Sequence, residues 1–282
     1  RHQIAPLVQA GYQVVVPDVR GYGGSARPES IEAYDMPHLI KDLLGLIAYF
    51  GAEQAILVGH DWGAPMVWNT AALHPERVRA VAAISVPYLP RGELSAIELW
   101  RKIYAGRFFY QLYFQAPGVA EAELERDVRR SLRMIYFNLS GDAPKDIWLQ
   151  PQAEADAPLL DGLIDPEILP AWLTEADLDY YTAQFEATGF RASLNRYRNQ
   201  QRDWELLPEL STTNVRPPCC LLVGSKEVVL SFVPDVDLTE SMKPYLDDLR
   251  MVQRIEGAGH WLQQERADRV TSDLLRFLAT LD

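Results

Sequence analysis

The sequence predicts an α/β protein with a mostly parallel sheet and an inserted all-helical subdomain. Strand-like and helix-like segments alternate near both ends of the chain, which is typical of a parallel sheet covered on both faces. From about Tyr88 to about Leu207 the strand signal disappears and apolar residues recur at helical spacing. Between an apolar run and a helix-like stretch, Gly59-His60-Asp61-Trp62-Gly63 indicates a sharp turn with a carboxylate at its apex.

The first part of the core, residues 1–87, is expected to alternate strands with helices. Short apolar runs bounded by turns indicate the strands, and apolar residues three and four positions apart indicate the helices. The expected strands are residues 12–17, 55–58 and 78–84. The expected helices are residues 36–49 and 64–73.

The insert, residues 88–207, is expected to be a helical cap that acts as a lid. In residues 121–136 apolar side chains share one helical face, and Glu125 can pair with Arg129 one turn further on. The sequence therefore predicts one amphipathic helix over this segment.

The later half of the insert begins with a segment of little periodicity. Residues 141–170 are rich in Asp, Pro and Ala, so we expect a long excursion over the surface. Thr174 and Asp177 then resemble a capping box, which predicts a helix that continues through Phe185.

The second part of the core, residues 208–282, resumes the alternation, with expected strands 219–223 and 251–255 and an amphipathic C-terminal helix. Cys219 and Cys220 are adjacent in the first of these strands, where successive side chains point to opposite faces. A disulfide between neighbours would strain the strand, so both are expected to be buried thiols in a reducing compartment. This predicts a cytoplasmic protein.

Composition and charge limit the class of partner. The chain has 282 residues, of which 48% are hydrophobic and 23% charged, as in ordinary globular proteins. Its net charge of -12 argues against a nucleic-acid partner or an anionic membrane surface. The apolar runs are shorter than the roughly 20 residues of a membrane span. We therefore expect small-molecule partners; oligomeric state leaves no signature in the sequence.

Asp61 has two interpretations. The glycines Gly59 and Gly63 permit a sharp turn that pushes the Asp61 side chain over the start of the helix, where backbone N–H groups stabilise an ionised nucleophile. Alternatively, Asp61 is only the N-cap of that helix, a position that aspartate favours.

Two further sites supply what a nucleophile needs, a base and a residue that orients it. His260 follows the last expected strand on a glycine-rich loop, at the sheet edge where ligands bind in open α/β folds. Glu227 follows the preceding strand and is expected at the same edge. The chain order nucleophile, acid, histidine is that of an α/β-hydrolase.

Along most of its length the chain resembles the α/β-hydrolase epoxide hydrolases, and in particular the soluble epoxide hydrolase subgroup. The resemblance is specific because it extends into the lid, whereas the turn at Asp61 is shared with dehalogenases. The matching segments are residues 18–25, 60–63, 75–80, 110–115, 117–119, 189–191, 195–199 and 259–261.

The resemblance implies a catalytic site and a reaction. It assigns Asp61 as the nucleophile that forms a hydroxyalkyl ester, and His260 as the base that activates water to hydrolyse it. It assigns Tyr110 and Tyr197 as lid residues that hydrogen-bond the epoxide oxygen. Substrate-pocket and oxyanion positions fall on Trp62, Gln111 and Trp261. The implied product is a vicinal diol, and no cofactor is required.

The chain departs from the family pattern in two places. Most relatives carry aspartate where Glu227 stands, so Asp235 and Asp237 are alternative partners of His260. Residues 1–4 resemble the first internal helix of the family, and the strands and the His-Gly-x-Pro loop that relatives place before that helix do not appear in this sequence. We therefore expect the sequence to be a truncated form that is unstable or inactive alone.

Two rival functions share parts of this site. A haloalkane or haloacid dehalogenase would use Asp61, Trp62 and His260 but would have no use for Tyr110 and Tyr197. A non-catalytic receptor of the same fold would only bind a small ligand. No metal site is expected, because the histidines other than those at the turn and the last loop are not clustered.

Overall fold

The computed structural model describes residues 1–144 and 146–281. The chain divides into two compact units, each described by itself. The sheet unit comprises Arg1–Val16, Ile40–Gly92 and Leu207–Asp282, and the helical unit comprises Pro17–Leu39 and Glu93–Leu206.

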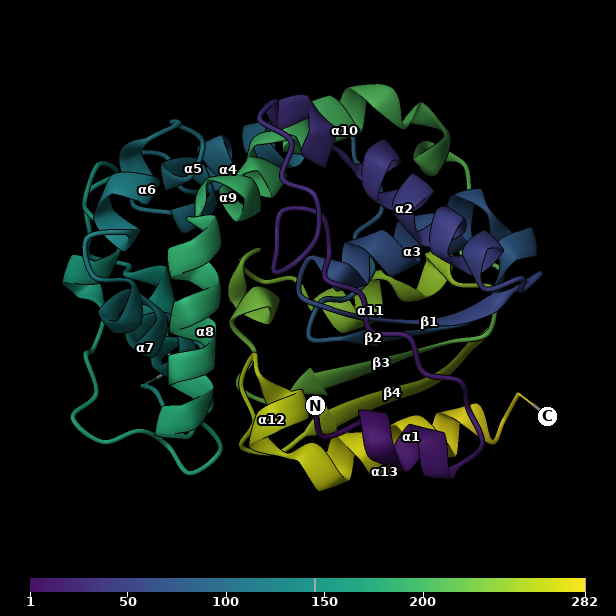
Figure 1. The fold of residues 1–282 in the computed structure, drawn as a ribbon. Helices are drawn as coiled ribbons and strands as arrows, with labels where there is room; N and C mark the ends of the chain where they lie inside the picture. The colour runs from purple at the N-terminus through teal and green to yellow at the C-terminus, as the bar shows by residue number, and fades with distance from the viewer. Residues whose placement is uncertain (145, 282) are drawn as a thin grey trace. The chain divides into compact units, whose positions relative to one another are not determined.

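Within the described residues the sheet has four parallel strands in the order β1-β2-β3-β4. The register pairs His60 with Ile84, Ile84 with Leu222, and Gly224 with Ile255, so all carboxyl ends lie at one edge (Figure 1). The segments expected at 55–58, 78–84, 219–223 and 251–255 are confirmed as strands. Their bounds are β1 Ala55–His60, β2 Val78–Ile84, β3 Cys219–Gly224 and β4 Leu249–Ile255.

Helices cover both faces of this sheet, as the apolar strands require. α3 packs on β1 and β2, and α13 packs on β3 and β4 on the opposite face (Figure 1). β3 is buried at every position, and both cysteines are buried free thiols, as expected. Most of α2, whose expected bounds are confirmed, also belongs to this unit. The helices are α1 Ile4–Gln9, α2 Met36–Tyr49, α3 Gly63–Leu73, α11 Leu238–Ser241, α12 Leu262–Glu265 and α13 Ala267–Leu278.

The strand expected at residues 12–17 is wrong. In the structure residues 13–19 have no regular secondary structure, and Val15 and Val16 are 42% and 68% exposed. Among the described residues no strand pairs with this segment. Residues that favour strands do so because they pack well on a half-buried sheet, and among the described residues no strand offers this segment such a surface.

The helical unit contains short helices joined by irregular segments. The capping box of Thr174 and Asp177 is confirmed, and its helix extends to Thr188. The irregularity expected for residues 141–170 is confirmed, because their described part contains only the 3-10 turns Ile147–Leu149 and Leu160–Gly162 and an isolated bridge at Glu154. The expected course over the surface is wrong in part, because Trp148 and Leu159 are buried. The α-helices are α4 Ala96–Ile103, α5 Tyr110–Tyr113, α6 Val119–Leu124, α7 Val128–Asn138, α8 Glu175–Thr188, α9 Arg191–Arg198 and α10 Gln200–Leu206.

The single helix expected over residues 121–136 is two helices, α6 and α7. Asp127 has a non-helical backbone and caps α7 by accepting a hydrogen bond from the backbone N–H of Arg130. The expected pair of Glu125 and Arg129 is also wrong. Glu125 accepts the backbone N–H of Phe190 instead, and Arg129 pairs with two acidic residues of α8, Glu175 and Asp179.

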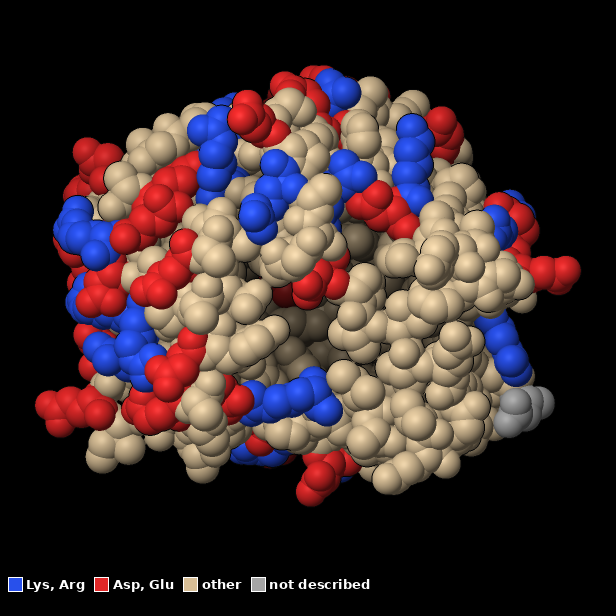
Figure 2. Space-filling model, in the orientation of Figure 1, with Lys and Arg blue, Asp and Glu red and all other residues tan. Residues whose placement is uncertain are grey.

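Opposite charges lie close together on the surface. Figure 2 shows acidic and basic side chains interspersed over the face in view. In the described part of the chain, no helix has the length and apolar character needed to cross a membrane.

Candidate active site

The carboxyl edge of the parallel sheet brings together polar residues that are far apart in the sequence. Each strand ends there, and a residue of interest follows each end: Asp61 after β1, Ser85 after β2, Glu227 after β3 and His260 after β4. Parallel strands in register place such loops side by side, which is why this edge carries the sites of open α/β folds.

Asp61 lies at the apex of a strained turn. Its φ is 52°, in the left-handed region that non-glycine residues rarely adopt. The turn brings the backbone so close that a Cβ on Gly59 would lie 2.1 Å from the carbonyl oxygen of Gly63. Gly63 itself has no such restriction, because nothing lies within 4 Å of its added Cβ. The expected requirement for glycine is therefore confirmed at Gly59, before the apex, and is wrong at Gly63, after it.

The N-cap interpretation of Asp61 is also wrong. The residue at the N-cap of α3 is Trp62, and no side chain caps the helix there. The Asp61 carboxylate instead contacts His260 Nε2 at 3.1 Å.

His260 lies between two carboxylates. Its Nε2 is 3.1 Å from Asp61 Oδ2, and its Nδ1 is 3.1 Å from both carboxylate oxygens of Glu227. The Glu227 side chain is fully buried, whereas that of Asp61 is 38% exposed and accessible to a small molecule. Neither alternative partner takes the place of Glu227: Asp235 is exposed, and Asp237 pairs with Arg254.

The charges of this triad support one another. Burial alone would lower the pKa of His260, but the carboxylates of Glu227 and Asp61 outweigh burial and raise its pKa to about 10. Burial opposes ionisation of Asp61, yet the hydrogen bond and charge of His260, together with the backbone N–H of Trp62, hold the pKa of Asp61 below its usual value. The resting site is therefore an ionised Asp61 beside a protonated His260.

The loop that carries His260 is fixed through its backbone. The carbonyl oxygen of His260 accepts hydrogen bonds from His60 Nε2 at 2.7 Å and from Ser85 Oγ at 2.8 Å. Burial lowers the pKa of His60 to about 4, so this imidazole is neutral and can donate from Nε2. On the other side, the carboxylate of Glu265 accepts the backbone N–H groups of Gly259 and Trp261.

Sequence reasoning missed Ser85 and Glu265, and it assigned His60 no part in the catalytic site. Ser85 had one available signal, since it directly follows a buried strand. Glu265 had none beyond its position one helical turn after Trp261, because its partners are backbone groups.

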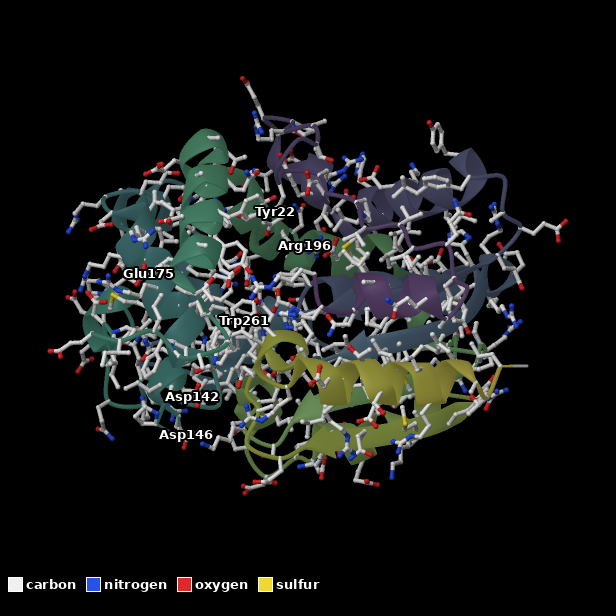
Figure 3. The ribbon with its side chains drawn as sticks, turned by 60° about the horizontal axis from the view of Figure 1, so that its bottom comes forward. Tyr22, Asp142, Asp146, Glu175, Arg196 and Trp261 are labelled. Carbon is white, nitrogen blue, oxygen red and sulfur yellow. The ribbon has the colours of Figure 1, made fainter. Side chains whose placement is uncertain are left out.

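The two tryptophans of the candidate pocket, Trp62 and Trp261, directly follow Asp61 and His260 in the sequence. Trp261, labelled in Figure 3 at the start of α12, packs its ring at 4.8 Å from that of His260 and at 5.5 Å from that of His60. Trp62 follows the nucleophile position, and its backbone N–H contributes to the low pKa of Asp61.

Tyr110, Gln111 and Tyr197 belong to the helical unit, where they form a second group. The rings of Tyr110 and Tyr197 are 5.9 Å apart, centroid to centroid. Gln115 joins their helices, because its Nε2 donates to the carbonyl oxygens of Gln111 and Tyr197. Gln111 Nε2 donates to the Tyr110 hydroxyl at 2.9 Å, and its Oε1 accepts from Trp100 Nε1 at 3.1 Å.

The described residues contain no group of three or more His, Cys, Asp or Glu side chains that could hold a metal ion. At the carboxyl edge of the sheet, the carboxylates of Asp61 and Glu227 contact the two ring nitrogens of His260.

The fold and the order of Asp61, Glu227 and His260 define an α/β-hydrolase. A family model described as alpha/beta hydrolase fold matches residues 1–267. Epoxide hydrolase A of Mycobacterium tuberculosis is 45% identical over all of this chain and 86% of its own length. Bifunctional epoxide hydrolase 2 of Rattus norvegicus is 37% identical over 99% of this chain and 49% of its own length.

Solved structures agree with these relatives. The crystal structure of epoxide hydrolase A from Mycobacterium thermoresistibile is 45% identical and covers 99% of this chain and 86% of its own, with a TM-score of 0.92. The chain therefore belongs to the α/β-hydrolase fold family, and within it to the epoxide hydrolases.

Proposed function

We propose that this chain hydrolyses epoxides to vicinal diols through a covalent ester on Asp61. The observation that carries this proposal is the position of His260, within 3.1 Å of both Asp61 and Glu227. A carboxylate that is already ionised can attack carbon directly, whereas a serine must first lose a proton. The chemistry of an epoxide, a strained ring with a polar oxygen, suits that nucleophile.

In the first step Asp61 attacks a ring carbon and the carbon–oxygen bond of the epoxide breaks. The oxygen that leaves the carbon needs a proton, and Tyr110 and Tyr197 are the proposed donors. The two tyrosines are neighbours in the helical unit, with ring centroids 5.9 Å apart. The products of this step are a hydroxyalkyl ester and a tyrosinate.

Ester formation changes the charge around His260. Its pKa of about 10 depends on two carboxylates, and the ester removes the charge of one of them. The pKa of His260 therefore falls, and its proton passes through solvent to the tyrosinate. His260 is then neutral and able to act as a base, with Glu227 still holding Nδ1.

In the second step His260 takes a proton from water, and the resulting hydroxide attacks the carbonyl carbon of the Asp61 ester. The backbone N–H of Trp62 is the proposed donor to the oxyanion. The diol alkoxide leaves and takes the proton from His260, and the new carboxylic acid of Asp61 then passes its remaining proton to His260, which restores the carboxylate and the imidazolium. No cofactor takes part in the proposed cycle.

Trp62 and Trp261 are the proposed apolar walls of the pocket, which favours hydrophobic epoxides. The mixed surface charge in Figure 2 and the net charge of -12 favour small molecules over nucleic acid as partners. The buried thiols of Cys219 and Cys220 favour a reducing compartment such as the cytoplasm.

The experiment is a single turnover of styrene oxide in ¹⁸O-labelled water with the protein in excess, followed by mass analysis of the peptide that contains Asp61. The ester route predicts diol product together with label in the Asp61 carboxylate, because water attacks the ester carbonyl. Diol formed without this label would mean direct attack by water. Halide release from a haloalkane without diol formation would mean a dehalogenase.

A further inference from the structure

A chain of hydrogen bonds in the helical unit ends at the Tyr110 hydroxyl. Trp100 Nε1 of α4 donates to Gln111 Oε1 at 3.1 Å, and Gln111 Nε2 donates to Tyr110 Oη at 2.9 Å. Trp100, Gln111 and Tyr110 are 4%, 8% and 8% exposed, so water cannot easily replace either bond.

The direction of both bonds follows from the chemistry of Trp100. An indole N–H can only donate, so the side-chain atom of Gln111 that faces it must be the amide oxygen. The amide NH₂ group therefore faces Tyr110, and an NH₂ group can only donate. The Tyr110 hydroxyl accepts from Gln111 through an oxygen lone pair, and its proton is directed to a different acceptor.

We propose that Trp100 and Gln111 are positioning residues that make Tyr110 a one-way proton donor to the epoxide oxygen. This inference rests on the proposed function. A hydrogen bond donated to the phenol oxygen stabilises the tyrosinate that forms when Tyr110 gives up its proton. Gln111 therefore aids the chemical step as well as the direction of the hydroxyl.

The surroundings hold this chain in place. The Trp100 ring packs at 5.2 Å from Phe109, and the Tyr110 ring packs at 5.3 Å from Trp148. The backbone carbonyl of Gln111 is bonded in turn by Gln115 Nε2 at 2.7 Å. Aromatic packing thus restricts Trp100 and Tyr110, the two partners of the Gln111 side chain, and Gln115 holds the Gln111 backbone.

Gln111→Glu and Gln111→Met test the direction of the bond while conserving the approximate size of the side chain. The ionised Glu variant still accepts from Trp100, but it also accepts the Tyr110 proton and so reverses the second bond. Ester formation should then fall by a factor on the order of 10² to 10³, since a charge-assisted bond holds the proton away from the substrate. The Met variant gives no bond in either direction and should lose on the order of tenfold.

The pH dependence separates this reversal from a packing defect. As pH falls and the carboxyl of the Glu variant gains a proton, it can donate to Tyr110 again. Its rate of ester formation relative to the wild type should therefore rise as pH falls, while that ratio for Met stays flat. If Gln111 only fills space, both variants should keep the wild-type rate of ester formation at every pH, because both conserve its approximate size; that result would overturn the inference.

Trp100→Phe keeps an aromatic ring beside Phe109 but removes the donor that fixes the amide. We expect a loss on the order of threefold to tenfold in the wild-type background, and no further loss when Gln111 is already Met. An equal loss in both backgrounds would mean that Trp100 acts by packing alone. Gln152→Glu is the matched control, because Gln152 is exposed in the same unit and the change adds the same charge.

The rate of ester formation is measured by rapid quenching and intact mass, with the rate of ester hydrolysis as a second readout that should change less. Absence of both ester and diol in the wild type would refute the proposed function, and the inference with it. Ester and diol in the wild type, with variants that ignore the predicted order, would refute the inference alone.

Discussion

Glu265 holds the loop of His260 from both sides. Its Oε2 accepts the backbone N–H of Gly259 at 2.9 Å, and its Oε1 accepts that of Trp261 at 3.0 Å. The residue is buried, so its two oxygens serve the loop rather than solvent. With the bonds from His60 and Ser85 to the His260 carbonyl, this arrangement fixes the backbone of the proposed base.

Glu265→Gln should therefore weaken the loop. The amide oxygen can accept only one of the two N–H groups, and the NH₂ group faces the other donor. We expect the free energy of unfolding to fall by about 1.5–3 kcal/mol, and ester hydrolysis to slow more than ester formation. Chemical denaturation and single-turnover kinetics measure these effects. Glu256→Gln on the same loop is the control, since Glu256 is exposed; an equal loss there would refute the assignment.

The positions of Asp61, Glu227 and His260 could be predicted from the sequence, whereas the residues that hold the His260 backbone in place could not. Asp61, Glu227 and His260 each follow a strand signal within a few residues, and parallel strands bring those positions together. The bonds to the His260 carbonyl join residues 200 positions apart for His60 and 175 for Ser85. Such bonds to backbone atoms leave no local pattern, because any residue can offer a carbonyl.

The two glycines around Asp61 should respond differently to alanine. A Cβ at Gly59 would lie 2.1 Å and 2.4 Å from the carbonyl oxygen and carbon of Gly63, so the turn must open. We expect Gly59→Ala to cost about 3 kcal/mol or more, or to prevent folding. Gly63→Ala should change stability by no more than about 1 kcal/mol, because its Cβ meets nothing and alanine favours a helix. Thermal unfolding measures the stability of both variants, and equal losses of stability would contradict the close approach of Gly59 to the Gly63 carbonyl group.

The two errors in the fold prediction have different physical causes. The strand expected at residues 12–17 and the unbroken helix over 121–136 were inferred from local composition and periodicity. In the structure the first segment finds no strand to pair with among the described residues, and Asp127 interrupts the second by capping α7. Strand pairing depends on a tertiary partner that composition does not report, whereas the Asp127 cap is a local bond to the backbone N–H of Arg130, which apolar periodicity alone overlooks.

The stability of the sheet unit should depend on pH through His260. A group whose pKa is raised in the folded state stabilises the fold below its unfolded pKa, and this contribution is lost as pH rises through the folded pKa. For His260 the loss runs from about 6.5 to about 10. The stability difference between wild type and His260→Gln should therefore shrink across this range. If denaturation measurements found the same stability difference between the two proteins from pH 6.5 to 10, they would contradict a protonated His260 held between the two carboxylates.

Removal of the hydroxyls of Tyr110 and Tyr197 should slow the proposed first step. Tyr110→Phe or Tyr197→Phe alone leaves one proposed donor, and turnover should fall by a factor on the order of ten to a thousand. The double variant should fall further. Steady-state diol formation measures the effect, with thermal unfolding as the check on folding. Unchanged turnover in the double variant would show that the tyrosines have another role.

His260→Gln separates the two proposed steps. Asp61 remains to attack the epoxide, but the variant has no imidazole to take a proton from water, so the ester should accumulate. Intact mass spectrometry should find an increase equal to the mass of the epoxide, and peptide analysis should locate it at Asp61. Glu227→Gln serves as the graded comparison, because its amide still contacts Nδ1 without the charge that supports the imidazolium. That variant should turn over slowly and hold a smaller fraction of ester in the steady state. A folded His260→Gln protein that consumes epoxide but never carries the adduct would mean that water, rather than Asp61, attacks the ring.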